Sequence, residues 1–358
     1  MMKVFWNRQS KWNHVISLTT AFSLLISLHV IAQKKGGSTA PTSKKQTPTI
    51  IKSTPQPLKP KVVKVVPPAK TEPEEEGGLI RIISNLVAIP VSVTDSAGQP
   101  IRNLGKDDFR IEEEGQSQPI EFLGEPGKTP VDLALLFDVS ASVHERFQFE
   151  QQAVSRFLKS VFRPTDAASV FSVGQVPKQV VVRTSNLAQV MSGAMTLIPT
   201  REGTALFDTV VQATHYLKET ASPGTRRVII VISDGEDNNS ERYNLAQSLR
   251  ELQQTDCLFY SINPSGPSIW LNKISQRGQS DMMAMATITG GYAFVPEKIE
   301  DLETVFHQIG TELQAQYLIG YYPTEEKNDG RFRRIAVKVP KRPELRIRAR
   351  QGYYAPKA

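Results

Sequence analysis

The stretch Leu-Ala-Leu-Leu-Phe-Asp-Val-Ser-Ala-Ser, residues 133–142, determines the fold that we predict for this chain. Five apolar residues, typical of a buried strand, are followed at once by three oxygen-bearing side chains at alternate positions, Asp138, Ser140 and Ser142. One carboxylate and two small hydroxyls on a tight loop suit a hard divalent cation, because such cations prefer oxygen ligands. The stretch therefore predicts a metal site at the carboxyl end of a buried strand.

Apolar strands and amphipathic helices alternate through residues 130–312, on both sides of this stretch. The strand candidates are 132–137, 168–173, 179–183, 227–232, 257–262 and 292–295. The helix candidates are 145–162, 187–197, 205–219, 243–255, 282–289 and 299–314. This alternation predicts an α/β fold, a doubly wound and mostly parallel sheet with helices on both faces.

Two further loops are expected at the same edge of the sheet, because ligands of such sheets bind outside the carboxyl ends of the strands. Thr204 follows Gly203, which permits a close approach of the backbone to a ligand, and Asp234 follows the apolar strand 227–232. Five oxygen donors on three loops then form one candidate metal site: Asp138, Ser140, Ser142, Thr204 and Asp234. The neighbouring Glu236 and Asp237 are expected to be solvated acids, with further ligands or a base as the alternative.

The order of these residues resembles the metal-ion-dependent adhesion site of von Willebrand factor type A (VWFA) domains. The matching pattern is Asp138-x-Ser140-x-Ser142, Thr204 in a Gly-Thr loop, and Asp234 in Ser-Asp-Gly, and the resemblance covers about residues 130–312. It implies that the Ser140, Ser142 and Thr204 hydroxyls contact the ion. It also implies that Asp138 and Asp234 bind the ion directly or through water.

The two flanks of the α/β segment, 79–126 and 316–356, are rich in strand patterns and predict a small β-domain built from both. In the first flank, 109–111 and 120–123 are expected as strands across a Glu-Gly turn. Because about 45 residues of sheet are too few to be stable alone, each flank needs the other. The flanks also resemble bacterial VWFA-related proteins seen most often in acidobacteria, in which a Gln-Tyr-x-x-Gly-Tyr-Tyr-Pro strand, here 316–323, follows the A domain.

The strands of the second flank carry many basic side chains, which we expect on a solvated face, with anion or polymer binding as the alternative. These residues are Arg331, Arg333, Arg334, Lys338, Arg346, Arg348 and Arg350.

Residues 1–32 predict a signal peptide or an uncleaved anchor, because Lys3, Arg8 and Lys11 precede the apolar run 15–32. Residues 33–78 are rich in Pro, Lys and Thr and predict a disordered linker. The remainder is therefore expected outside the cytoplasm, secreted, periplasmic or tethered to a membrane through an uncleaved leader. The only cysteine, Cys257, excludes an intramolecular disulfide and is expected to be a buried small hydrophobe.

The net charge of +7 belongs to the leader and linker: residues 1–78 carry +8, and the other 280 carry −1. The folded part is thus almost neutral, and nucleic acid is not expected as a partner.

The charge of the predicted site favours recognition of a ligand over catalysis. Asp138 and Asp234 balance one divalent ion and the hydroxyls add no charge, so the ion can take the carboxylate of a partner's Asp or Glu as its last ligand. The hydroxyl-rich site favours Mg²⁺, with Mn²⁺ or Ca²⁺ as alternatives. We therefore predict an exported, metal-dependent protein-binding or adhesion module of the bacterial envelope, not an enzyme.

Two alternatives remain from the sequence alone. The first is a structural module of an envelope or secretion assembly that does not use the metal site for binding. The second is a metal-dependent hydrolase, which is disfavoured because no His or Glu base accompanies the site and no residue is assigned as catalytic. The partner, the oligomeric state and the role of the stretch 265–280 stay open.

Overall fold

The structure, a computed structural model, describes residues 86–140, 146–267, 273–325 and 328–357. The chain divides into two units, Met1–Gly78 and Leu79–Ala358, and every described residue belongs to the second. The predicted signal or anchor and the predicted linker therefore lie outside the described residues. Within the described part, no helix is both long enough and apolar enough to span a bilayer.

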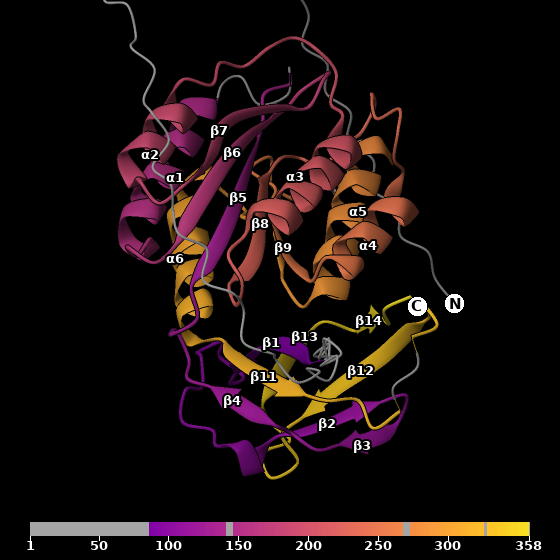
Figure 1. The fold of residues 1–358 in the computed structure, drawn as a ribbon. Coiled ribbons are helices and arrows are strands. Elements are labelled where there is room, and N and C mark those ends of the chain that lie inside the picture. Colours follow the sequence, from indigo (N-terminus) through magenta and orange to yellow (C-terminus); the bar gives the residue numbers. More distant parts are fainter. Residues whose placement is uncertain (1–85, 141–145, 268–272, 326–327, 358) are drawn as a thin grey trace, which may run out of the picture. The chain divides into compact units, whose positions relative to one another are not determined.

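A six-stranded sheet forms the centre of the α/β segment (Figure 1). The strands follow the order β10-β9-β8-β5-β6-β7, and all neighbours are parallel except β6 and β7, which are antiparallel. Their bounds are β5 (Val131–Asp138), β6 (Ala167–Val173), β7 (Lys178–Thr184), β8 (Arg226–Ile232), β9 (Cys257–Ile262) and β10 (Ala293–Phe294). The predicted mostly parallel sheet is confirmed.

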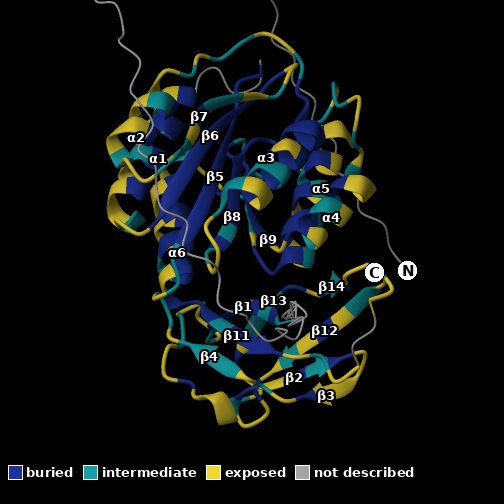
Figure 2. Ribbon diagram, viewed as in Figure 1, coloured by how far each residue is buried: buried dark blue, intermediate teal, exposed yellow. Residues whose placement is uncertain are grey.

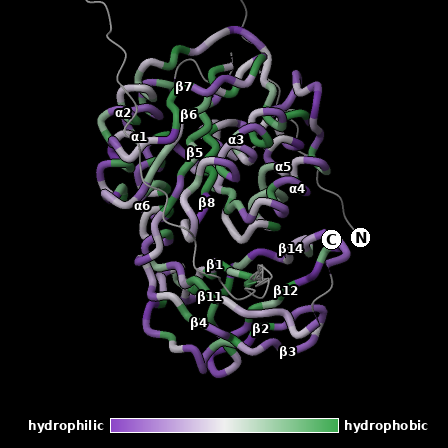
Figure 3. Tube along the Cα trace, viewed as in Figure 1, coloured by the Kyte–Doolittle hydropathy of each residue, from purple (hydrophilic) through white to green (hydrophobic). Residues whose placement is uncertain are grey.

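Helices cover both faces of this sheet, because successive residues of a strand point to opposite faces. Leu135 packs among the side chains of α1 (Phe147–Val161), α2 (Leu187–Met195) and α6 (Leu302–Ala315). Leu136 packs among those of α3 (Leu206–Thr220), α4 (Leu245–Gln254) and α5 (Lys273–Thr289). The central strands are accordingly buried along their length and hydrophobic on both faces (Figures 2 and 3). This is the doubly wound arrangement that the sequence predicts.

Helix α5 is longer than predicted, because it begins at Lys273 and not near residue 282. The second half of the stretch 265–280 is therefore helical. The buried face of this first part is made of small residues, Ser275 and Gly278, which carry no hydrophobic periodicity for the sequence to reveal. Gly278 lies directly against the backbone of Gly235, where a Cβ atom would collide with the main chain.

The two flanks pair with each other in two four-stranded sheets, which confirms the predicted β-domain built from both. The first sheet has the order β13-β1-β11-β4, with β1 (Val87–Thr94), β4 (Phe122–Gly124), β11 (Tyr317–Tyr321) and β13 (Arg346–Ala349). The second has the order β14-β12-β2-β3, with β2 (Arg110–Glu113), β3 (Gln116–Gln118), β12 (Phe332–Lys338) and β14 (Gly352–Tyr354).

The prediction that strands at 109–111 and 120–123 face each other across the Glu-Gly turn was wrong. Strand β2 pairs across the turn with β3, a polar Gln-Ser-Gln segment, while β4 belongs to the other sheet. The turn forms because Glu114 and Gly115 both have positive φ, 48° and 83°, as a tight two-residue hairpin connection requires. A strand without apolar residues gives no alternation, so the sequence pattern did not predict it.

Not all basic residues of the second flank lie on a solvated face, which corrects another expectation. Arg350 is only 7% exposed and pairs with Asp256, and Arg348 pairs with the buried Glu312. Arg334 and Lys338 are paired across the sheet with Glu114 and Glu112. The acids that neutralise these four side chains are distant in sequence, whereas Arg331 and Arg346 are exposed, as expected.

Candidate metal centre

Asp138 and Asp234 lie at the carboxyl ends of β5 and β8, which are neighbouring parallel strands. The register pairs Phe137 with Ile232, so the residues that follow each strand meet at one edge. From this position the chain continues outward in opposite directions, through β6 on one side and β9 on the other. The predicted site is thus at the switch point of the sheet, where ligands of such folds bind.

The Asp138 carboxylate is fully buried and is held by neutral donors of Ser140 and Ser233. Its Oδ1 accepts a hydrogen bond from the Ser140 backbone N–H at 2.9 Å, and its Oδ2 accepts one from the Ser233 hydroxyl at 2.6 Å. Burial raises the pKa of Asp138 to about 6; the hydrogen bonds from Ser140 and Ser233 oppose this shift, and the charge of Asp234 adds to it. The side chain is therefore fixed in place, yet its negative charge is poorly compensated.

The loop after β8 holds Asp234 in a defined turn. The Asp234 Oδ1 accepts a hydrogen bond from the Glu236 N–H at 3.1 Å, and the Gly235 N–H donates to the Ser233 hydroxyl at 3.0 Å. Gly235 has a φ of +84°, and a Cβ atom there would lie 2.6 Å from the carbonyl oxygen of Gly278 in α5. Only glycine fits this position, so α5 and the turn together fix the acid.

Thr204 is buried and is held by the side chain and backbone of Asn238. The Thr204 N–H donates to Asn238 Oδ1 at 2.8 Å, and its carbonyl accepts from the N–H groups of Asn238 and Asn239 at 3.1 and 3.0 Å. Gly203 permits this approach, because a Cβ atom there would lie 2.7 Å from Asn238 Oδ1. The group that lies close to the backbone at Gly203 is thus the side chain of Asn238.

Hydrogen bonds join the Thr204 loop to the ends of β5 and β6 as well. Thr200 donates its backbone N–H to the carbonyl of Val139 at 2.5 Å, and Ala205 donates to the carbonyl of Gly174 at 2.8 Å. The structure therefore brings four predicted residues to one buried edge: Asp138, Ser140, Thr204 and Asp234. The fifth, Ser142, lies outside the described residues.

Glu236 and Asp237 are not the solvated acids that we expected. Asp237 Oδ1 accepts hydrogen bonds from the N–H groups of Leu206 and Phe207, at 2.8 and 3.3 Å, and thereby caps α3. Glu236 accepts a hydrogen bond from the Ser275 hydroxyl of α5. Sequence reasoning also missed Ser233 and Asn238, although the polar run from Ser233 to Ser240 was a signal that this loop makes many bonds.

The donor set fits a hard divalent cation. Among the described residues, no Lys, Arg or His forms an ion pair with Asp138 or Asp234, although both are buried. Glu150 on α1 is also buried, at 1% exposure, and neither of its carboxylate oxygens has a hydrogen-bond partner. Buried carboxylates are costly unless a cation or hydrogen bonds compensate them. In the described ranges no three His, Cys, Asp or Glu side chains could hold an ion together, so a cation at this edge would need hydroxyl ligands as well.

No described histidine serves this edge as a base. His215 on α3 lies 2.8 Å from Glu251 on α4, and His307 is on α6. His144 lies outside the described residues. The described groups at the edge are thus oxygen donors held by backbone and hydroxyl hydrogen bonds.

Fold and site together define an α/β domain with an oxygen-rich site at the switch point of a mostly parallel sheet. The family model of the von Willebrand factor type A domain matches residues 133–236, and the chain contains a domain of this family. The resemblance predicted from the sequence is confirmed at this level, while membership of the narrower bacterial class stays a prediction. The comparison with curated proteins found no match.

Several solved structures are similar to this chain. One is a von Willebrand factor type A protein from Catenulispora acidiphila, with 13% identity and a TM-score of 0.44 over 64% of this chain and 51% of that one. Another is the vWF domain of the type V pili tip protein Mfa5 from Porphyromonas gingivalis, with 13% identity and a TM-score of 0.43 over 51% and 94%. A third is proximal thread matrix protein 1 from the mussel byssus with a zinc-occupied MIDAS motif, with 15% identity and a TM-score of 0.43 over 55% and 48%.

Proposed function

We propose that the chain is an exported protein-binding module that holds a divalent cation at the β5–β8 edge and captures an acidic side chain of a protein partner. One observation carries this proposal: Asp138 and Asp234 are buried on adjacent strand ends with neutral hydrogen-bond donors and, within the described part of the chain, no cationic partner. A bound cation removes the cost of burying these charges.

The residues that would hold the cation are the five predicted from the sequence. Ser140, Ser142 and Thr204 would bind through hydroxyls, and Asp138 and Asp234 would supply the charge, directly or through water. When bound, the cation supplies a Lewis acid with room for one outside oxygen. Mg²⁺ is favoured by the small oxygen donors, and Mn²⁺ and Ca²⁺ are the alternatives.

The chain's own residues set the charge and position of this site. Only two carboxylates, Asp138 and Asp234, would lie next to the ion and the three hydroxyls are neutral, so the ion would stay Lewis acidic enough to take an oxygen of a partner's Asp or Glu as its last ligand. The Ser233 hydroxyl and the Ser140 N–H orient Asp138, while Asn238 orients Thr204. This preorganisation supports binding because the ligands need little rearrangement to receive the ion.

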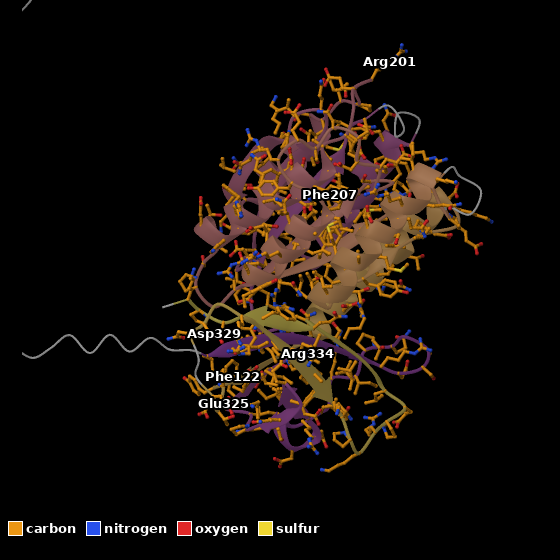
Figure 4. The ribbon with its side chains drawn as sticks, turned by 90° about the vertical axis from the view of Figure 1, so that its right-hand side faces the viewer. Phe122, Arg201, Phe207, Glu325, Asp329 and Arg334 are labelled. Atoms are coloured by element: carbon orange, nitrogen blue, oxygen red, sulfur yellow. The ribbon has the colours of Figure 1, made fainter. Side chains whose placement is uncertain are left out.

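Exposed side chains on the neighbouring loops support a protein as the partner. Val176 and Ile198 are 74% and 76% exposed, although both are aliphatic. The Val176 loop is bonded to the site through Asn239 Nδ2, which donates to the Gln175 carbonyl at 2.8 Å, and Ile198 lies two residues before the tethered Thr200. Arg201 projects outward from the same loop (Figure 4) and would attract an acidic partner.

The exported location rests on the sequence of residues 1–32, and it makes envelope proteins the first class of partner to test. Capture from an envelope extract by the immobilised exported chain should require Mg²⁺ and should be lost with EDTA or with Asp138→Ala. Asp107→Ala is the matched control, because this acid is exposed on the short helix η1 (Lys106–Asp108). Capture that survives both EDTA and Asp138→Ala would favour the structural module that does not use the metal.

A further inference from the structure

Glu150 occupies a position on α1 where an apolar side chain is expected. The buried face of this helix is otherwise largely apolar and includes Phe147, Ala153, Val154 and Phe157. Glu150 shares that face and is 1% exposed, and both of its carboxylate oxygens are buried without a hydrogen-bond partner. Such an acid costs stability unless something compensates it.

Among the residues that the structure describes, no side chain forms a hydrogen bond or an ion pair with Glu150. Arg146, one turn earlier on the same helix, is the nearest candidate cation, but its guanidinium donates to the carbonyl of Pro264 at 2.9 Å. Among the described residues Glu150 forms no ion pair. The contacts of Glu150 therefore give no structural reason for an acid at this position.

Glu150 faces the candidate metal centre. The ring of Phe147 lies edge-on against that of Phe137, the residue before Asp138, with centroids 6.4 Å apart. Glu150 follows Phe147 by three residues and so lies on the same side of the helix. Burial first, and then the charge of Asp138, raise the pKa of Glu150 to about 8; Asp234 adds to the shift and Arg146 opposes it.

We infer that Glu150 is a third carboxylate of the metal centre and accepts hydrogen bonds from water molecules bound to the cation. This inference rests on the proposed function, because it requires a cation at Asp138 and Asp234. Contact through water, and not directly, follows because no three acids of the described chain are close enough to hold one ion. The orphaned oxygens of Glu150 then have donors, and the extra negative charge attracts the cation.

Glu150 would therefore be a positioning residue of the centre. Groups that orient the ligands or waters of a metal ion commonly change its affinity 10- to 100-fold, in proteins generally, when they are replaced. The opposite holds for the metal-free protein, in which removing an uncompensated buried charge should not destabilise the fold. A lower affinity for the ion combined with an unchanged or higher melting temperature without it is a pattern that a purely structural residue does not produce.

The test uses Mn²⁺ alone as the probe, with free Mn²⁺ measured by electron paramagnetic resonance in the full exported chain. Glu150→Gln keeps the shape and removes the charge, and Glu150→Met fills the same volume. We expect both variants to bind Mn²⁺ about 10-fold or more weakly than the wild type. In EDTA both should melt at or above the wild-type temperature. Glu303→Gln on α6 is the matched control, because its carboxylate is exposed and pairs with Arg156.

Each of the other possible outcomes of these measurements would overturn one specific claim. Equal Mn²⁺ affinity of wild type and Glu150→Gln would overturn the role of Glu150 and leave the proposed function intact. A lower melting temperature in EDTA for both variants would make Glu150 a structural residue. A loss as large as that of Asp138→Ala would make it a direct ligand and overturn the contact through water. Absence of Mn²⁺ binding in the wild type would overturn the proposed function, and this inference with it.

Discussion

Two buried aspartates lie on the same strand, β5, and they differ in every contact. Asp132, near the start, is 1% exposed and accepts hydrogen bonds from Arg183 at 2.5 and 3.3 Å, from Thr225 at 2.7 Å and from the Ser222 N–H at 3.0 Å. Asp138, at the end, is equally buried, but its hydrogen-bond donors belong to Ser140 and Ser233 and are all neutral. Burial alone therefore does not mark a ligand site, because the two acids differ in whether a cationic side chain compensates them.

The same contrast extends across the sheet. At the end of β5 that carries Asp132, Asp166 pairs with Arg163, and the buried Arg226 donates to carbonyl oxygens of Thr129 and Leu313. At the other end, Asp138, Glu150 and Asp234 are buried with no cationic partner among the described residues. Asp208 is also buried there without a cation, but its carboxylate accepts several backbone N–H bonds from residues 241–243. The protein's own cations compensate the acids of the first edge, and under the proposed function a bound ion would compensate those of the second.

The largest expected effect is the loss of the ion when Asp138 is replaced. Asp138→Ala should weaken Mg²⁺ or Mn²⁺ binding by about 100-fold or more, because it removes one of two charges that balance the ion. Isothermal titration calorimetry measures this directly. Asp132→Asn, the same kind of change on the same strand, should bind the ion as the wild type does. If both variants lost the same ion affinity, Asp132 and Asp138 would not differ in their role at the ion.

Stability should respond in the reverse sense. Asp132→Asn should lower the free energy of unfolding by about 2 kcal/mol, because it leaves the partly buried Arg183 guanidinium without its carboxylate. Asp138→Asn should cost much less in the metal-free protein, since an uncompensated charge is removed. Urea unfolding in EDTA measures the free energy of unfolding of both variants. A larger loss for Asp138→Asn would show that Asp138 is structural.

The metal-free protein should lose stability as the pH rises from about 4.5 to about 8. Glu150 has a pKa raised from 4.5 to about 8 in the fold, so the folded state holds its proton more tightly and the benefit disappears once that proton is lost. The charges that act on it are those of Asp138 of β5, Asp234 after β8 and Arg146, the N-cap residue of α1. The two pKa values correspond to a decline of about 5 kcal/mol over this range.

Comparison with Glu150→Gln isolates this contribution, because the variant keeps every other titrating group. Urea unfolding of both proteins in EDTA at several pH values gives the difference. A pH profile that is the same in wild type and variant would exclude Glu150 as its source.

The smallest effects should come from the rim of the site. Ile198→Ser and Val176→Ser should each weaken partner capture about five-fold, because each removes one aliphatic contact worth about 1 kcal/mol. Stability and ion affinity should stay as in the wild type, since both side chains are exposed. Val182→Ser on β7, 59% exposed, is the control and should leave capture unchanged. If all three variants weakened capture equally, Ile198 and Val176 would not be part of the surface that binds the partner.

Most of the α/β segment could be predicted because its strands are continuous apolar runs and its helices repeat at helical spacing. The elements that were missed lack these signals: β3 is entirely polar, and the first half of α5 buries a serine and a glycine. Among the site residues, Asp138, Ser140, Thr204 and Asp234 were predicted from their places at strand and helix ends. Asn238 and Asp237 were not, because their bonds go to residues about 30 positions away.

The sequence by itself determined that acids and hydroxyls follow the central strands, because side-chain type and strand length are local properties. Only the tertiary structure decided which buried acids are compensated. Asp132 and Asp138 are six residues apart and look equivalent in the sequence, yet the partner of Asp132, Arg183, comes from a strand 51 residues away. Compensation of a buried charge depends on what the fold brings within hydrogen-bond distance, and no local pattern encodes that.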